Sequence, residues 1–536
     1  MSSTPAPTSE ERETGDGLLT RALGWVERVG NRLPHPFWIF VLLAAVVLLL
    51  SELLARLGVA ATDPASGDTV TVTSLLNAEG FRQIVEGVVP NFVEFPPLGV
   101  VLTVLLGVAV AEGSGLIHTA LRVVVSKVSA RWLTFVLALA GVTGSIASDA
   151  ITVVLIPLGA AAFKAAGRSA VLGGVVAFAA SSAGFNASLL VNLTDPLLGG
   201  ISTSAAQLVD PEYQVSPVAN YFFSASSAIV LAIVITLVTE LLLTKLTRPI
   251  HDAEQAAEER GETSAPDHEE DRPALTEENL RMYSPQEVKG LRSTAIAVAV
   301  YLVVYFLLLF VPFSPLAGQD EELGVLSSVL ITDISGPIGL MFLVAGVAYG
   351  MTARTVTHPA AVPELMARGL KDITPLLVLF FAAAQFIAYF SWTNMGTVLA
   401  IRGSEWLGGG DVPMVVLFAG VVLVVAVMNL LVTSGSAQYT LTAPVIVPMF
   451  MYLGINPETT QMLFRIGDST TNIITPLNPF FAMTLGMIQR YLPRAGIGTL
   501  LSLTLPLSLA LLVVWFLFFL AWIALGIPLG PGSPVQ

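Results

Sequence analysis

Two ionisable residues stand three positions apart inside an apolar part of the chain, in the stretch LFRIGDSTTNIITPLNPFFAM. Arg465 and Asp468 are followed there by hydroxyl groups, by Asn472 and by two prolines. An ionisable side chain at bilayer depth costs about 3 kcal/mol on insertion scales, and proline cannot continue the hydrogen bonding of a helix. A guanidinium suits bidentate capture of a carboxylate, so the stretch predicts a solute-binding site. The i, i+3 spacing also allows Arg465 and Asp468 to neutralise each other as a structural pair.

A second polar interruption, SSAGFNASLLVNLTDPLL from Ser181, resembles the first in kind. It carries Asn186 and Asp195, and Pro196 follows directly. Asp195 at this place either caps a helix that restarts at Pro196 or takes part in proton or ion coupling.

Both polar interruptions need apolar helices that hold them inside the bilayer, and the chain's composition is rich enough in apolar residues to form such helices. The chain of 536 residues is 54% hydrophobic and only 12% charged, whereas soluble domains carry about 25% charged residues. This balance indicates a polytopic membrane protein. The absence of cysteine excludes disulfides, thiolate metal sites and cysteine nucleophiles.

Nine crossings and two re-entrant hairpins account for the apolar segments. The hairpins, at about 131–166 and 412–454, contain small and polar residues in the middle of each apolar run. The crossings begin near Phe37, Pro97, Ser169, Ala219, Ser293, Gly336, Leu376, Thr460 and Thr499. With a cytoplasmic N-terminus, this arrangement leaves only Arg56, Arg82 and Arg402 outside and Arg465 within the membrane, which fits the positive-inside rule.

The two hairpins are copies of one motif. GSIASDAITVVLIPL from Gly144 aligns with GSAQYTLTAPVIVPM from Gly435 without a gap, matching Ser145 with Ser436 and Pro157 with Pro448. Since an odd number of crossings separates them, the hairpins open to opposite sides of the membrane. We therefore predict an all-α polytopic membrane protein with an inverted repeat, as in secondary transporters.

The inverted repeat divides the chain into a cytoplasmic tail (1–36), a first half (37–248), a linker (249–292), a second half (293–526) and a C-terminal tail (527–536). The linker is acidic with almost nothing apolar to bury, which predicts a flexible cytoplasmic segment. A regulatory domain is the alternative for this segment.

Unwound backbone at bilayer depth is tolerated where it lines a cavity, and its oxygens coordinate hard cations. We expect the ion-coupling residues to be Ser145, Ser148, Asp149, Asn186, Asp195, Gly435 and Asn472. A possible sodium ion would lie at Ser145, Asn186 and Asn472. Asp149 has the same ambiguity as Asp195.

Enzyme chemistry finds no support in the sequence. HEED at His268 is not HExxH, and neither a GxSxG elbow nor a phosphate loop ending in GK and Ser or Thr occurs. We therefore expect no resident cofactor, no nucleic-acid partner, and transport driven by a gradient of Na⁺ or H⁺.

Five stretches of this chain together strongly resemble the AbgT family of bacterial aminobenzoyl-glutamate transporters, from about Trp25 to the last crossing. They are GSIASDAITVVLIPLGAAAF, GFNASLLVNLTDPLLGGIS, LFFAAAQFIAYFSWTNMG, TSGSAQYTLTAPVIVPM and FRIGDSTTNIITPLNPFFAM. The resemblance implies a dimer in the inner membrane, with an inner domain for oligomerisation and an outer domain for transport. It also implies uptake of p-aminobenzoyl-glutamate, or export of antimetabolites such as sulfonamides.

By position, the family's functional residues resemble Asp195, Ser436, Pro457, Arg465 and Asp468 of this chain. One position departs, because Tyr439 stands where the family often has tryptophan. Tyrosine keeps an aromatic stacking face and adds a hydroxyl group.

From the residues and the resemblance together, we expect a secondary transporter for an amphipathic aromatic carboxylate. We expect the substrate-binding residues to be Ser436, Tyr439, Pro457, Arg465 and Asp468. Arg465 would hold the carboxylate and Tyr439 would stack on the ring, and Asp195 and Asp468 are the candidate protonatable groups. The alternatives are a dicarboxylate/sodium symporter on the same hairpin architecture, an ion channel and, more remotely, an intramembrane enzyme. The direction of transport, the coupling ion and the stoichiometry stay open.

Overall fold

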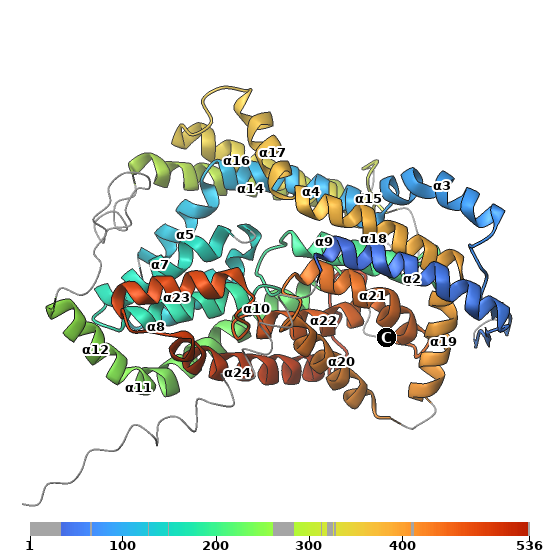
Figure 1. The fold of residues 1–536 in the computed structure, drawn as a ribbon. Coiled ribbons are helices and arrows are strands. Elements are labelled where there is room, and N and C mark those ends of the chain that lie inside the picture. Colours follow the sequence, from blue (N-terminus) through green and yellow to red (C-terminus); the bar gives the residue numbers. More distant parts are fainter. Residues whose placement is uncertain are drawn as a thin grey trace, which may run out of the picture.

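The protein is almost entirely helical, as Figure 1 shows for the computed structural model of the chain. The structure describes residues 34–64, 67–126, 128–147, 150–260, 284–311, 314–318, 325, 328–408 and 412–533. Within these ranges, a two-stranded antiparallel sheet of β1 (Ala60–Thr62) and β2 (Thr69–Thr71) is the exception. All but the last three residues of the predicted N-terminal tail lie outside these ranges.

Seven helices in the described ranges are long and apolar enough to cross a membrane, judged by length and composition. They coincide with seven of the nine predicted crossings. Two of the seven join successive elements, α3 with α4 and α10 with its extension through η3 (Thr239–Leu243) and α11 (Thr244–Leu246). The elements are α2 (Pro36–Arg56), α3 (Ala78–Val93), α4 (Pro96–Gly113), α10 (Tyr221–Val238), α14 (Pro285–Phe310), α16 (Ser335–Ala353), α18 (Thr374–Trp392) and α24 (Ile497–Ala524).

The two predicted hairpins are both helix–turn–helix units. The first runs from α6 (Leu133–Thr143) through a 3₁₀ turn, η1 (Gly144–Ala147), to α7 (Ala150–Ala165). The second joins α20 (Met414–Asn429) to α21 (Gly435–Met451), whose first turn is capped by the Ser434 hydroxyl. In the second hairpin, the small and polar residues of the motif therefore form the start of the second arm, and in the first hairpin the described residues Gly144–Ala147 form a turn.

The two remaining predicted crossings are broken helices. One passes from α8 (Ala170–Phe178) through a wide π turn, η2 (Ala179–Ala183), to a non-helical stretch and then α9 (Thr194–Ala206). The other passes from α22 (Pro457–Thr471) to α23 (Pro479–Tyr491). Asn192 Oδ1 accepts hydrogen bonds from the main-chain N–H groups of Thr194 and Asp195. The asparagine side chain thus gives two N–H groups at the start of α9 a partner.

The predicted linker is shorter than the sequence suggested, because both of its ends are helical. Arg248–Glu259 forms α12, and Pro285–Arg292 is the beginning of α14. Glu254 is buried and accepts hydrogen bonds from the Ser169 hydroxyl and the Val171 amide at the start of α8. One carboxylate with defined partners thus anchors a segment that its composition indicated to be flexible, and residues 261–283 lie outside the described ranges.

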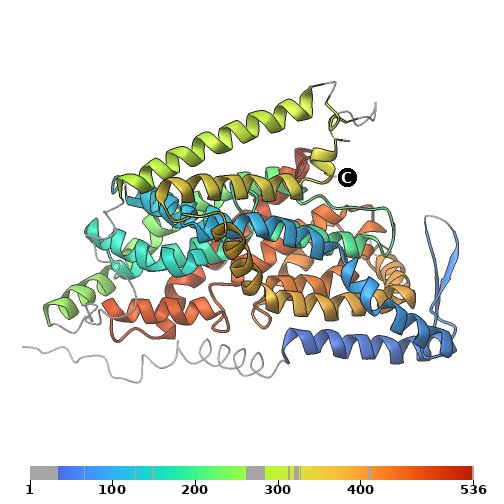
Figure 2. The same ribbon diagram turned by 90° about the horizontal axis from the view of Figure 1, so that it is seen from above.

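The helices form two main packing groups. The largest hydrophobic cluster joins the first hairpin to α8, α10, α22 and α24, and a second cluster joins α2 to α18. Figure 1 shows α22 near the middle of the molecule, where α9, α20, α21 and α24 contact it. Figure 2 shows α14 along one edge beside α16. The remaining helices of the described residues are α5 (Leu116–Ser126), α15 (Val329–Thr332), α17 (Ala361–Asp372) and α19 (Met395–Gly408).

Candidate functional site

All fifteen residues of helix α22 are buried. A helix buried on every side is normally apolar all round. This one carries Glu458, Gln461, Arg465 and Asp468 at spacings of three, four and three residues, which places them along one face. The face meets α9 and α21, so residues from both halves of the chain surround it.

Arg465 forms an ion pair with Asp195 across the two halves. Arg465 Nη1 lies 2.7 Å from Asp195 Oδ1, and the two side chains are only 1% and 11% exposed. The other carboxylate oxygen of Asp195 accepts from the Asn192 amide at 2.8 Å. The sequence left open a local pair between Arg465 and Asp468, and the structure instead joins Arg465 to a residue 270 positions earlier.

Arg465 keeps unused hydrogen-bonding capacity. Its Nε and Nη2 atoms are buried and have no partner among the described residues. Each buried donor without a partner costs about 1–3 kcal/mol, so this arrangement is unfavourable unless another group completes it. Two parallel N–H donors on a planar guanidinium match the two oxygens of a carboxylate.

Asp468 lies one helical turn further along α22 and is also only partly satisfied. Asn186 Nδ2 donates to Asp468 Oδ2 at 2.9 Å, whereas Oδ1 is buried with no partner in the described part of the chain. Gly435, the first residue of α21, lies against this carboxylate, because a Cβ atom there would be 3.0 Å from Oδ2. The absence of a side chain thus lets the second hairpin approach the carboxylate closely.

Asn429, at the end of α20, is a central residue of this site that the sequence analysis missed. Its Nδ2 lies 2.5 Å from the main-chain oxygen of Asp468 and 2.9 Å from both Thr471 Oγ1 and Asn472 Oδ1. Asn472 in turn donates to the main-chain oxygen of Ser182, in the π turn of the first half. The signal was present, since Asn429 is a single amide at the end of an otherwise apolar helix.

The tip of the first hairpin contacts the same region through Asn192. Asn192 Nδ2 donates to Ser145 Oγ at 3.0 Å, and Ser145 donates to the main-chain oxygen of Val142. The structure therefore places Ser145 beside the Asp195 segment, whereas Asn186 and Asn472 belong to the hydrogen bonds around Asp468 and Asn429. Ser148 and Asp149 lie outside the described residues.

The other predicted substrate residues are more widely spread along α21 and α22. Tyr439 is 1% exposed, its ring centroid lies 4.4 Å from that of Phe464, and its hydroxyl is 2.6 Å from Ser202 Oγ. Ser436 is half-buried in the first turn of α21. Pro457 begins α22, eight residues before Arg465, which corresponds to about 12 Å along the helix axis.

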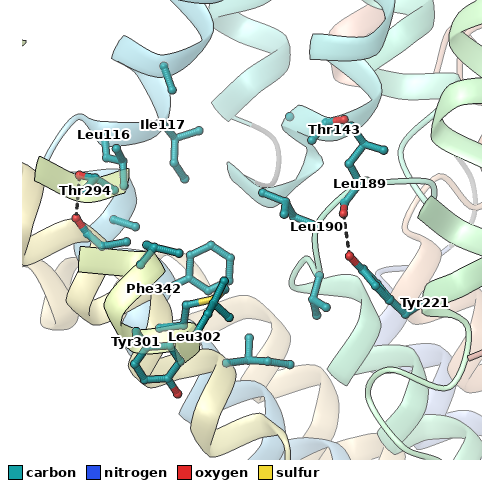
Figure 3. A pocket seen from close by; sticks show the side chains of 18 of the residues that line it. Leu116, Ile117, Thr143, Leu189, Leu190, Tyr221, Thr294, Tyr301, Leu302 and Phe342 are labelled. Atoms are coloured by element: carbon teal, nitrogen blue, oxygen red, sulfur yellow. Dashed lines mark hydrogen bonds between the residues drawn. The ribbon is translucent and has the colours of Figure 1, made fainter. Parts of the chain in front are cut away.

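A large cavity lies apart from these charges. Its volume is about 880 Å³, and it separates residues of α5, α14 and α16 from α6, α10 and the stretch 189–191 (Figure 3). Most polar side chains in its wall donate to main-chain oxygens, as in the bonds from Tyr301 to the Pro337 oxygen and from Tyr221 to the Leu189 oxygen, and Thr143 Oγ1 is buried without a partner among the described residues. This apolar cavity has no charged side chain in its wall that would bind a carboxylate.

Comparison with known proteins yields close relatives over nearly the whole chain. Residues 21–536 match the model of the family described as "AbgT putative transporter family". The p-aminobenzoyl-glutamate transport protein of Escherichia coli K12 is 36% identical over 95% of this chain and 96% of its own length. The crystal structure of the Alcanivorax borkumensis YdaH transporter, with an unusual topology, has a TM-score of 0.83 at 40% identity, covering 93% of this chain and all of its own. Neisseria gonorrhoeae MtrF, a member of a class of antimetabolite efflux pumps, has a TM-score of 0.85 at 36% identity, covering 96% and all of its own.

Proposed function

The chain belongs to the AbgT transporter family and is a multi-pass membrane transporter rather than an enzyme, and we propose that it moves an aromatic carboxylate of the p-aminobenzoyl-glutamate class by ion-coupled secondary transport. A sulfonamide-like antimetabolite is a second substrate class, which the similarity to MtrF favours. The proposed location is the bacterial cytoplasmic membrane, with the N-terminus in the cytoplasm.

The observation that carries the substrate proposal is the unused pair of donors on Arg465. Asp195 neutralises the guanidinium through Nη1, which leaves Nε and Nη2 for the carboxylate of the solute. The neighbouring Tyr439 and Phe464 form an aromatic wall beside this position. Tyr439 is covered in this conformation, so stacking on the substrate ring would require α21 to shift along α22.

We place the coupling ion at Asp468, about one helical turn beyond Arg465 in α22. Asp468 Oδ1 and Asn429 Oδ1 are both buried acceptors without a partner among the described residues. Carboxylate and amide oxygens beside an unwound segment suit Na⁺, and a single carboxyl group with an amide neighbour suits H⁺. Binding of either would complete the hydrogen bonding or coordination of this pair.

The proposed topology has nine crossings and two re-entrant hairpins in an inverted repeat, with halves at 37–248 and 293–526. It is supported by the hydrogen bonds that join the broken helix of one half to that of the other. Single cysteines introduced at Ser145 and Ser436 test it by labelling from each side of the membrane. Accessibility of both from the same side would contradict the inverted arrangement.

We further propose that the transporter is a homodimer that uses the exposed face of α14. This helix is 26 residues long, and only 6% of its most apolar 18-residue stretch is buried. Lipid tails would solvate such a face, so exposure alone does not require a partner. Crosslinking of single cysteines at Val300 or Val303 in membranes would support the dimer, and its absence at both would contradict it.

Flux measurements in proteoliposomes test the proposed function. Labelled p-aminobenzoyl-glutamate and a sulfonamide would be offered under imposed Na⁺ and H⁺ gradients in turn. The proposal expects saturable flux that one gradient drives. Equal flux of glutamate-like diacids without an aromatic ring would favour a dicarboxylate symporter, and conduction without saturation would indicate a channel.

A further inference from the structure

A buried carboxyl group lies at the beginning of α22, two helical turns from Arg465, where the substrate and ion proposals do not use it. Glu458 is 5% exposed. Its Oε2 accepts from the Tyr213 hydroxyl at 3.0 Å, and its main-chain oxygen accepts from Asn220 Nδ2 at 2.9 Å. Both partners come from the segment 207–220 between α9 and α10, which therefore covers this end of α22.

No cationic side chain forms an ion pair with Glu458 among the described residues. Tyr213 of the covering segment bonds its carboxyl group, and Tyr439 of α21 is close enough to interact with its charge. Asp210 lies near Tyr213, and Arg465 lies near Tyr439. The start of a helix favours a negative charge, but this effect is small beside the cost of burying an unpaired carboxylate. A glutamine would make the same hydrogen bond with Tyr213 at lower cost, so packing alone does not account for an ionisable group here.

The polar face of α22 connects Glu458 to the substrate residues. Gln461 Oε1 accepts from Ser202 Oγ at 2.8 Å, which uses the one hydroxyl proton of Ser202. The contact of 2.6 Å between Ser202 and Tyr439 is then donated by the tyrosine. These bonds hold α9, α21 and α22 together at a level between Glu458 and Arg465.

The covering segment is fastened to α9 rather than to α22 alone. The Val215 amide donates to Thr203 Oγ1 of α9 at 2.9 Å, and within the segment Gln207 Nε2 donates to the main-chain oxygen of Tyr213. Separation of the segment from α22 would expose Glu458 to water, and return of the segment would bury it again. Water favours the ionised form of a carboxyl group, and burial favours the neutral form.

We propose that Glu458 is a proton-binding group of an external gate formed by the segment 207–220 and the start of α22. Closure of the gate takes one proton from the external water onto the Glu458 carboxylate, and opening returns it. External acid thus favours the closed gate. The inference rests on the proposed transport function and topology, which place this end of α22 outside, and it adds a dependence on external pH that Asp468 does not supply.

Thiol labelling tests the gate without any need for transport, and the chain has no native cysteine to interfere. Thr459→Cys places a thiol beside Glu458 at a position that is 1% exposed. The measurement is its labelling rate in the full-length protein in membranes, with an impermeant maleimide outside. Glu212→Cys, on the exposed part of the same segment, corrects for the pH dependence of thiol ionisation itself.

We expect the corrected labelling rate at Thr459→Cys to fall with external acid by up to about tenfold per pH unit, the limit for one linked proton. Glu458→Gln in the same background should abolish this dependence, and Tyr213→Phe should raise the rate at every pH. Glu212→Gln is the matched control and should leave the pH dependence unchanged. A dependence that persists in Glu458→Gln, or that is absent with Glu458 intact, would overturn the proposal.

Two further measurements separate this inference from the function on which it depends. Glu458→Asp keeps the carboxyl group and should restore a pH dependence, whereas a purely structural role would predict the same defect in both variants. If Thr459→Cys with Glu458 intact shows gated labelling but the wild-type protein shows no flux of p-aminobenzoyl-glutamate, the proposed substrate is wrong and the gate stands. If flux is present and labelling is insensitive to Glu458, the gate is wrong and the substrate stands.

Discussion

The polar centre, formed by Asn186, Asp195, Asn429, Arg465 and Asp468, differs from the apolar cavity in almost every physical respect. The cavity has a volume of about 880 Å³ and no charged side chain in its wall, and Thr294 and Tyr301 there donate to main-chain oxygens. The polar centre is closely packed and leaves donors and acceptors unused on both Arg465 and Asp468. Incomplete hydrogen bonding of buried charges, rather than the size of a hollow, therefore identifies the binding site.

The difference follows from the backbone around each region. Unbroken helices form most of the cavity wall, so their main-chain groups are satisfied internally. The polar centre lies where two helices are interrupted. Asn472 donates there to the main-chain oxygen of Ser182 in the opposite half of the chain, and Asn186 donates to the Asp468 carboxylate. The breaks in the two helices thus leave main-chain polar atoms that need hydrogen-bonding partners.

The largest expected effect comes from Arg465→Ala. This change removes the substrate's partner and leaves Asp195 as a buried charge without compensation, which costs about 3–5 kcal/mol. We expect flux to fall to background in proteoliposomes. Arg465→Lys is the control, because it keeps the charge and loses the planar donors, and recovery of normal flux with lysine would contradict bidentate binding.

Asp468→Asn should have the next largest effect and should separate binding from coupling. The amide keeps the volume and cannot ionise, so p-aminobenzoyl-glutamate should still bind while the driving gradient no longer accelerates flux. Equilibrium binding and gradient-driven flux on the same preparation check this. Unchanged acceleration by the gradient would show that Asp468 is not the coupling group.

Asn429→Ala should produce a smaller loss that concerns the ion more than the solute. It removes one amide that bonds Thr471, Asn472 and the main chain at Asp468. The change also removes Asn429 Oδ1, one of the two proposed ligands of the ion. Loss of one such contact, worth about 1–1.5 kcal/mol, predicts a roughly tenfold higher ion concentration for half-maximal flux. An unchanged ion requirement would place the ion elsewhere.

Ala120→Phe, in the wall of the apolar cavity, should have the smallest effect. It places an aromatic ring in the cavity and changes no residue of the polar centre. We expect flux to change by less than about twofold, since a cavity without polar partners contributes no carboxylate binding. Strong inhibition would show that the cavity is part of the transport path and would contradict the assignment of binding to the polar centre alone.

Much of the architecture could be predicted from the sequence because its signals are local. Apolar length marks the long helices, and small polar residues mark the turns near Gly144 and Gly435. The broken helices were visible from prolines and polar runs. Arg465, Asp468 and Asp195 stood out because ionisable residues are rare in such segments.

The partners in the polar centre could not be predicted in the same way. The bond between Arg465 and Asp195 joins residues 270 positions apart, and no local rule selects it over the i, i+3 neighbour. Asn429, Ser202 and Gln461 are ordinary polar residues by composition, and only their tertiary contacts give them a role. The helix α12 was missed because a single buried carboxylate, Glu254, anchors an otherwise polar segment.

The most direct test of the account is the affinity of the purified transporter for p-aminobenzoyl-glutamate and for its neutral diamide analogue. A charge-assisted bidentate contact is worth about 3 kcal/mol, so the wild-type protein should prefer the acid by about 100-fold. Arg465→Ala should abolish that preference and leave the affinity for the diamide nearly unchanged. An equal preference for the acid in both proteins would show that another group holds the carboxylate and would contradict the central claim.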